Sequence, residues 1–353
     1  MTLPAPPARS FASDNAAGAH PAVLEAIARV NIGHALAYGD DGETRACERR
    51  FSELLGRDVT TLLTFNGTGA NVLALTSLAR PGDAAICTEW AHVNVDETGA
   101  PERIAGIKLI DVTAPDGKLT PAHIDHHAHA LGDFHHAQPA IVSITQSTEL
   151  GTAYSSDEIG SICDAAHRHG MRVHMDGARI ANAVASAGAD VAALRAMTVD
   201  AGVDVMTFGG TKNGMLGGEA VLFLDPELGA RGQYVRKSVT QLPSKMRFLA
   251  AQFNALLEDD LWLALAGHAN RMATELHTTV STIGGVDPGP EPVVNSVFPI
   301  LPPAAIGALQ AWSFFWDWDR SRHQVRWMTA WDTRTDDIAT FATGVRQILA
   351  GSD

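Results

Sequence analysis

The sequence predicts an α/β protein with a mostly parallel central sheet, helices on both faces of that sheet, and a small C-terminal α/β domain. Short apolar segments alternate with helical patterns up to about residue 245, as in parallel sheets covered by helices. A long helical stretch and a strand-rich tail follow. The length of 353 residues suffices for one large domain and a smaller one.

The elements follow in a regular order. Pro21 stands near the first position of the first predicted helix, and Ser155 and Gly170 are suited to begin and end a later one. The predicted helices cover residues 21–31, 44–55, 68–79, 121–131, 155–170, 245–283 and 335–350. The predicted strands cover residues 59–65, 84–88, 107–112, 140–145, 171–175, 203–208, 293–300, 312–317 and 324–330. We expect an N-terminal arm (1–20), a large domain (21–269) and a small C-terminal domain (270–353).

The composition restricts the class of protein. The formal net charge of −14 argues against nucleic acid as a partner, because phosphate binding requires clustered Lys and Arg. Three widely spaced cysteines form no CxxC pair, which favours a reducing cytoplasm over a disulfide framework. The Pro/Ala-rich residues 1–10 do not resemble a signal peptide, and no apolar run reaches the length of a membrane span.

Lys212 and Asp176 are the strongest chemical signal. Lys212 lies in Phe208-Gly209-Gly210-Thr211-Lys212-Asn213-Gly214 after an apolar strand, and Asp176 follows another strand in His174-Met175-Asp176-Gly177-Ala178-Arg179. Ligands of open α/β sheets bind beyond the carboxyl ends of the strands. A solvated lysine and a helix-capping aspartate are the ordinary alternatives. Together, however, Lys212 and Asp176 suit pyridoxal 5′-phosphate: the lysine amine forms a Schiff base, and the carboxylate keeps the pyridine nitrogen protonated.

Further candidates lie near these two residues. Gly67 and Thr68 begin a helix in Asn66-Gly67-Thr68-Gly69, where free amides could bind a phosphate. His92 could stack on the coenzyme ring and handle protons, oriented by Asp96, or be an ordinary surface histidine. Arg179 could pair with Asp176, or it could reach the coenzyme or the substrate.

Two other features leave alternatives open. Arg326 interrupts an apolar strand, which suggests either a substrate carboxylate or an internal ion pair as its partner. The histidines at 123, 126, 127, 129, 135 and 136 lack the spacing of a clean metal-ligand set, and we predict no metal site. His135 and His136 precede a strand and could reach the pocket.

These residues together resemble the threonine aldolase family of fold-type I pyridoxal-phosphate enzymes over nearly the whole chain, and the low-specificity bacterial branch in particular. Matching strings occur in order throughout the sequence: Phe11-Ala12-Ser13-Asp14-Asn15, Ala37-Tyr38-Gly39-Asp40-Asp41, Phe65-Asn66-Gly67-Thr68, Ala91-His92-Val93, Gly99-Ala100-Pro101-Glu102, the Asp176 and Lys212 strings, and Ser244-Lys245-Met246-Arg247.

The resemblance implies a role for each matching position. Lys212 would be the Schiff-base lysine, Asp176 the partner of the pyridine nitrogen, and His92 the stacking residue. Gly67 and Thr68 would hold the phosphate, and Arg247 would reach the phosphate of a neighbouring subunit. Ser13, Arg179 and Arg326 would surround the substrate carboxylate. The resemblance also implies a homo-oligomer, a tetramer built from dimers that share active sites.

The expected reaction is a retro-aldol cleavage of L-threonine, L-allo-threonine or related L-β-hydroxy-α-amino acids to glycine and an aldehyde. The alternatives are another reaction of the same coenzyme, such as β-elimination or transamination, or a non-catalytic metal-binding protein. Many family members carry a histidine in an Asn-Thr-His string where this chain reads Thr145-Gln146-Ser147-Thr148-Glu149. His135 is expected to take its place, and the base is His92, His135 or a water molecule that they hold.

Overall fold

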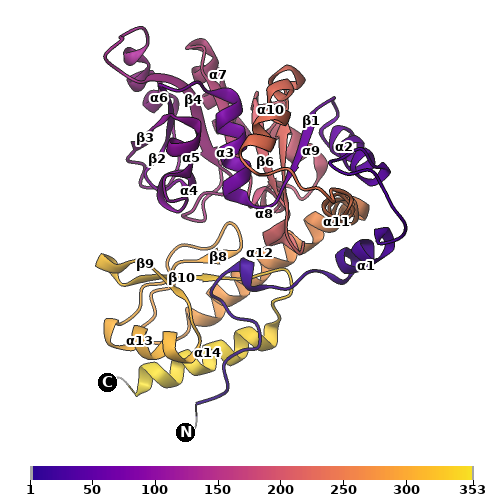
Figure 1. The fold of residues 1–353 in the computed structure, drawn as a ribbon. Helices are drawn as coiled ribbons and strands as arrows, with labels where there is room; N and C mark the ends of the chain where they lie inside the picture. The colour runs from indigo at the N-terminus through magenta and orange to yellow at the C-terminus, as the bar shows by residue number, and fades with distance from the viewer. Residues whose placement is uncertain (1–2, 352–353) are drawn as a thin grey trace.

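A seven-stranded sheet forms the centre of the computed structural model, which describes residues 3–351 (Figure 1). Within this part of the chain the strand order is β1-β7-β6-β5-β4-β2-β3. The strands are β1 (Thr60–Thr64), β2 (Asp83–Thr88), β3 (Lys108–Val112), β4 (Gln138–Thr145), β5 (Arg172–Asp176), β6 (Val205–Gly209) and β7 (Glu219–Phe223). Strands β2 to β6 pair in parallel, whereas β7 is antiparallel to both β6 and β1. The predicted α/β class is therefore confirmed.

Helices cover both faces of this sheet (Figure 1). They are α1 (Pro21–Val30), α2 (Gly42–Leu55), α3 (Gly67–Leu78), α4 (His92–Val95), α5 (Ala100–Ala105), α6 (Pro121–His127), α7 (Ser156–Arg168), α8 (Ile180–Ala187), α9 (Val191–Met197), α10 (Pro226–Ser238) and α11 (Arg247–Leu257). Successive strand residues point to opposite faces. Val205 and Val221 pack with α3 and α10, while Met206 and Leu222 pack with the helices of the other face. Both faces are apolar, which explains the nearly continuous hydrophobic strands.

The C-terminal part forms a second, smaller layer. A three-stranded antiparallel sheet of order β8-β10-β9 is covered by helices (Figure 1). Its elements are α12 (Leu261–Val280), β8 (Ser296–Val297), α13 (Pro303–Trp312), β9 (Trp316–Asp319), β10 (Gln324–Met328) and α14 (Thr335–Ala350). Helix α12 serves both parts: Trp262 and Ala266 belong to the core of the large sheet, whereas Ala273 and Val280 belong to the core of the small one. The division at residues 269 and 270 stays a prediction.

Among the segments that differ from the sequence-based expectation, three concern strands. The apolar strand β7 was not predicted. Residues 303–312 form helix α13, so the strand expected from residue 312 begins only at Trp316. Of the strand expected over 293–300, only Ser296–Val297 pair regularly. The proline at the first position of α13 favours the start of a helix there. The alternating aromatic residues at the end of this segment had suggested a strand instead.

The N-terminal arm lies along the small sheet rather than the large one. The Phe11 ring packs against Phe341 with a centroid distance of 4.7 Å. The Met328 amide donates to the Phe11 carbonyl at 2.8 Å. The arm then leads into α1, which packs on α11 of the large part. Among the described residues, every helix is too short or too polar to span a membrane, and the three cysteines are buried free thiols.

Close backbone packing at the end of β6 gives a test of this fold. A Cβ at Gly209 would lie 2.2 Å from the Ala178 carbonyl oxygen, so Gly209→Ala requires backbone displacement. We expect it to lower the free energy of unfolding by about 3 kcal/mol, measured by urea denaturation. Gly217→Ala is the control, because no atom lies within 4 Å of its Cβ position. Equal stabilities of the two variants would contradict this packing.

Candidate active site

A narrow pocket at the carboxyl ends of β4, β5 and β6 brings together half of the ten site residues that the sequence singled out. Gly67, His92, Asp176, Arg179 and Lys212 all line it. They come from separate elements that meet at one edge of the sheet, as expected for an open α/β architecture.

Lys212 lies in a short 3-10 turn, η3 (Thr211–Asn213), directly after β6. Gly214 ends the turn with a φ of 90°, a conformation that favours glycine. The Asn213 side chain anchors the turn by donating to the Trp262 carbonyl at 2.9 Å. Within residues 3–351 the Lys212 amine has neither an ion-pair nor a hydrogen-bond partner. Burial, together with the nearby Arg179 charge, lowers the pKa of Lys212, which favours the neutral amine that a nucleophile requires.

Asp176 ends β5 as a buried carboxylate. Its Oδ2 accepts from the Asn71 amide at 2.8 Å, and its Oδ1 accepts from the Ala178 amide at 2.9 Å. Burial alone would raise the pKa of Asp176, but the His92 charge and these hydrogen bonds lower it below the ordinary value. Asp176 therefore remains anionic, as the partner of a protonated ring nitrogen must.

His92 begins helix α4 at the pocket wall. Its Nδ1 lies 2.8 Å from Glu97 Oε1, and this hydrogen bond is the main reason that the pKa of His92 is raised. Glu97 also accepts from Asn71 at 2.9 Å. The expectation that Asp96 orients His92 is therefore wrong, because α4 ends at Val95 and the chain then turns Glu97 toward the ring.

The N-terminus of α3 provides free backbone donors. Asn66 caps the helix by accepting from the Gly69 amide at 2.8 Å. In the described chain the amides of Gly67 and Thr68 make no hydrogen bond, and Gly67 faces the pocket. Gln241 packs against Gly69, where a Cβ would meet it at 2.2 Å. This end of the helix can accept an anionic group.

Arg179 pairs with an acid on the N-terminal arm. Its Nε and one terminal nitrogen donate to the two Asp14 oxygens at 2.7 and 2.9 Å. Burial would raise the pKa of Asp14, but Arg179 lowers it to about 2. The ion pair with Asp176, one of the alternatives for Arg179, is not formed. Ser13 caps the short turn that carries Asp14, accepting from the Asn15 amide at 3.2 Å.

Arg326 is a cation without a matching acid. It lies on β10 with its guanidinium 4.6 Å from the centre of the Trp318 ring, and its buried Nε has no hydrogen-bond partner among residues 3–351. Burial and the Arg179 charge lower the pKa of Arg326 to about 10. Of the two alternatives for this residue, the internal ion pair is absent from the described chain. An anion would therefore be stabilised strongly here.

Thr68, Ser13 and Arg326 do not line the pocket of this chain themselves, and two further candidates lie away from it. His135 is exposed in the loop before β4, and its amide is bonded to Asp133 at 2.9 Å. That loop lies at the amino end of the strand, whereas the pocket is at the carboxyl end, so His135 does not reach it. Arg247 begins α11 and donates to the Gly33 carbonyl at 3.3 Å, beside the segment 33–37.

Sequence reasoning missed two buried acids that line the pocket. The Glu219 carboxylate on β7 accepts from the Gly210 amide at 2.9 Å, next to the Lys212 turn. The Glu149 carboxylate accepts from the His92 amide at 2.7 Å. Burial raises the pKa of each acid to about 7. The signal for Glu219 was its place at the start of an apolar run, which predicts a strand.

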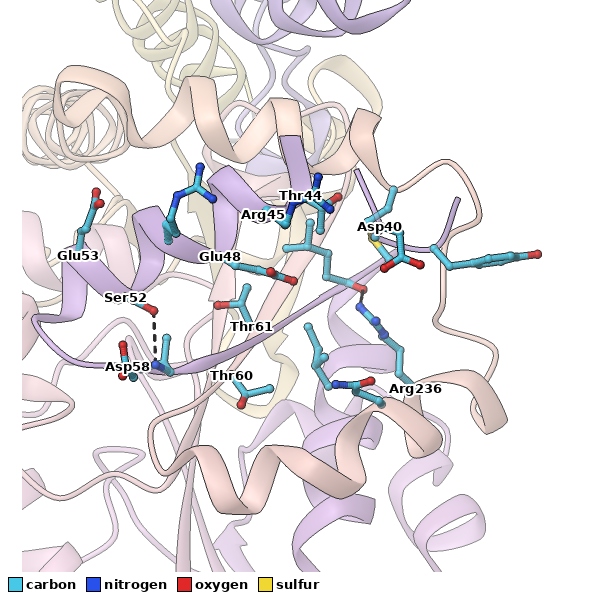
Figure 2. A pocket seen from close by; sticks show the side chains of 18 residues that line it. Asp40, Thr44, Arg45, Glu48, Ser52, Glu53, Asp58, Thr60, Thr61 and Arg236 are labelled. Atoms are coloured by element: carbon cyan, nitrogen blue, oxygen red, sulfur yellow. Dashed lines mark hydrogen bonds between the residues drawn. The ribbon is translucent and has the colours of Figure 1, made fainter. Parts of the chain in front are cut away.

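A wider cleft of about 790 Å³ lies elsewhere, along the outer edge of β1 between α2 and α10. Figure 2 shows its mixed wall of basic and acidic side chains, with Arg236 bonded to the Leu63 carbonyl at 3.3 Å. Arg45 and Glu48 line it as well, but it contains no lysine and no histidine. We locate the candidate site in the narrow pocket, because the Lys212 amine and the buried carboxylates converge there.

The sheet order and the lysine and aspartate at adjacent strand ends define the class of fold-type I pyridoxal-phosphate enzymes. The same fold is present in mouse CSAD, with a TM-score of 0.76 at 13% identity. The family model of the beta-eliminating lyases matches residues 10–301, and the chain belongs to this family.

Several relatives are similar over nearly the whole length of the chain. The low specificity L-threonine aldolase of Pseudomonas aeruginosa is 42% identical over 97% of this chain and 98% of its own. The solved threonine aldolase of Leishmania major has a TM-score of 0.88 at 30% identity, covering 98% of this chain and 99% of its own. The yeast (Saccharomyces cerevisiae) low specificity L-threonine aldolase is 30% identical over 47% of this chain.

The raised pKa of Glu219 predicts a pH-dependent stability. Between an ordinary glutamate pKa of 4.5 and the folded value of about 7, the folded state binds more protons than the unfolded state. Stability conferred by the protonated acid is therefore lost as pH rises through this window. Glu219→Gln removes this titration. The free energy of unfolding of the variant, relative to that of the wild type, should therefore increase by about 3 kcal/mol between pH 4.5 and 8. Parallel urea-denaturation series of the coenzyme-free proteins measure it; a constant difference would contradict the burial of a neutral acid.

Proposed function

We propose that this chain is a pyridoxal-phosphate-dependent aldolase that cleaves L-threonine and related L-β-hydroxy-α-amino acids to glycine and an aldehyde. The observation that carries the proposal is that one pocket contains both the Lys212 amine, which has no hydrogen-bond or ion-pair partner among the described residues, and the buried, anionic Asp176. It is supported by full-length similarity to a protein named low specificity L-threonine aldolase. A solvent-facing amine or an Asp176 neutralised by burial would not support it.

The residues of the pocket fit the coenzyme. Lys212 would attach its aldehyde carbon, and Asp176 would accept a hydrogen bond from its protonated ring nitrogen. The free amides of Gly67 and Thr68 would bind its phosphate at the positive end of α3. His92 would lie against the ring, held by Glu97. When bound, the coenzyme supplies an acceptor for the electron pair that is released at Cα.

The other pocket residues would orient the amino acid. Arg326 is unpaired and suited to the substrate carboxylate. Arg179 would contribute mainly its remaining terminal nitrogen, because Nε and the other terminal nitrogen bind Asp14. Ser13 would act through the turn that holds Asp14. After it is released and protonated, the Lys212 amine could deliver that proton to Cα and yield glycine, and its lowered pKa makes the ammonium a better proton donor than an ordinary lysine.

A second copy of the chain would complete the pocket in the proposed oligomer. Arg247 lies outside its own pocket, which supports the idea that it serves the phosphate of a neighbour. The nearby Ile32, Leu36 and Tyr38 are more than half exposed, at 77%, 73% and 52%, and would be covered by the second copy. Dimers, tetramers of such dimers, and a cytoplasmic location remain proposals.

Replacing the lysine tests the function directly. Purified wild type with added coenzyme should be yellow and convert L-threonine to equimolar glycine and acetaldehyde. Lys212→Ala should lose the visible absorbance of the Schiff base and turn over at least about 10³-fold more slowly. Lys108→Ala, on the exposed edge strand β3, is the control. A yellow Lys212→Ala protein, or keto-acid products from the wild type, would contradict the assignment.

The carboxylate site is tested by Arg326→Ala. Loss of a charged hydrogen-bond donor costs about 1.5–3 kcal/mol, so KM for L-threonine should rise roughly 10- to 100-fold. The effect on kcat should be smaller than the effect on KM. Arg322→Ala, on the exposed turn before β10, should leave KM unchanged. An unaltered KM in Arg326→Ala would remove this residue from substrate binding.

A further inference from the structure

Glu149 occupies the place where the expected second histidine is missing. It lies four residues after the end of β4, at the same sheet edge as Asp176, and lines the pocket that contains Lys212. The residue as a whole is partly exposed, but its Oε2 has no contact with solvent. The loop therefore directs a carboxylate, rather than an imidazole, into the pocket.

The two oxygens of this carboxylate differ. Oε1 accepts from the His92 amide at 2.7 Å and from the Thr145 hydroxyl at 3.1 Å. Oε2 is buried and has no hydrogen-bond partner among residues 3–351. A buried oxygen without a donor is costly, so the group is suited to receive a donor that the folded chain does not itself supply. A hydroxyl of the substrate is such a donor.

The charges around Glu149 suit a proton acceptor. Burial and the negative charge of Asp176 raise the pKa of Glu149 to about 7, against the opposing effect of its hydrogen bonds. A base is most effective when its pKa is near the working pH. His92 is less suitable, because its bond to Glu97 raises its pKa and favours the protonated ring. His135 is at the opposite edge of the sheet.

We propose that Glu149 is the general base that removes the β-hydroxyl proton of the substrate; this inference rests on the proposed aldolase function. The carboxylate forms an O–H bond with that proton. The electron pair of the hydroxyl O–H bond becomes the second bond of the aldehyde carbonyl while the Cα–Cβ bond breaks. The pair from the Cα–Cβ bond is the one that the coenzyme accepts. The protons balance because Glu149 passes the hydroxyl proton on to solvent, while glycine gains one at Cα from the protonated Lys212 amine.

Glu149→Gln separates this role from a structural one. The glutamine oxygen can accept the same two hydrogen bonds as Oε1, and the amide replaces the basic oxygen. We expect kcat for L-threonine cleavage to fall by roughly 10²- to 10⁴-fold. Exchange of the glycine α-proton in deuterated solvent should continue at a rate within about threefold of wild type, because it breaks no Cα–Cβ bond. Glu227→Gln, an exposed residue in the first turn of α10, is the matched control.

Two further measurements do not depend on turnover. The visible spectrum and the dissociation constant of the coenzyme should be unchanged in Glu149→Gln. The coenzyme-free variant should also lack the part of the stability loss between pH 4.5 and 8 that comes from Glu149, because its folded pKa is raised. The charged and titratable groups that face Glu149 are the same in both proteins: Cys87, His92, Tyr154, Asp176, Arg179 and Arg326.

The outcomes are distinct. Loss of cleavage with retained exchange and coenzyme binding supports Glu149 as the base. Cleavage at near wild-type rate would overturn it while leaving the aldolase function intact. Joint loss of cleavage, exchange and coenzyme binding would also overturn it, because the residue would then be structural. A wild type that releases no glycine and aldehyde from L-threonine would reject the proposed function itself.

Discussion

The site depends on keeping one carboxylate ionised in a buried pocket that contains several others. An isolated buried charge is costly, and burial alone would neutralise Asp176. The Asn71 amide and the charge of His92 prevent this. Glu97 in turn stabilises the protonated form of His92. Not every acid in this space can remain fully ionised. Burial and the charge of Asp176 raise the pKa of Glu149 to about 7.

The substrate side is held by a contact between three parts of the chain. Asp14 from the arm binds Arg179, which precedes α8. The Oδ2 atom of Asp14 also accepts from the Asn295 side chain, near the small sheet, at 3.1 Å. The arm therefore supplies the acid that neutralises one arginine, and the other, Arg326, has no counter-ion in the part of the chain that the structure describes. This division explains how a pocket with two nearby guanidinium groups keeps one of them available for an anion.

The strand pattern and the rule that ligands bind at carboxyl strand ends were enough to predict Lys212 and Asp176 as neighbours. The same rule, applied to residue 135, would have excluded His135, which the sequence had suggested as a candidate base, because residues before a parallel strand lie at the opposite edge. The antiparallel direction of β7 could not be predicted, because a strand buried on both faces has no directional signal. The partnership of Asp14 with Arg179 joins residues 165 positions apart and depends on how the arm packs.

A carboxylate rather than a histidine at position 149 is consistent with the charges of this pocket. A histidine there would be one more cation beside His92 and Arg179, and its proton affinity would fall. A carboxylate is affected in the opposite direction: the charge of Asp176 raises its basicity, while its two hydrogen bonds keep enough of the ionised form. The acidic surroundings that make Asp176 hard to keep ionised thus make Glu149 a stronger base than an ordinary glutamate.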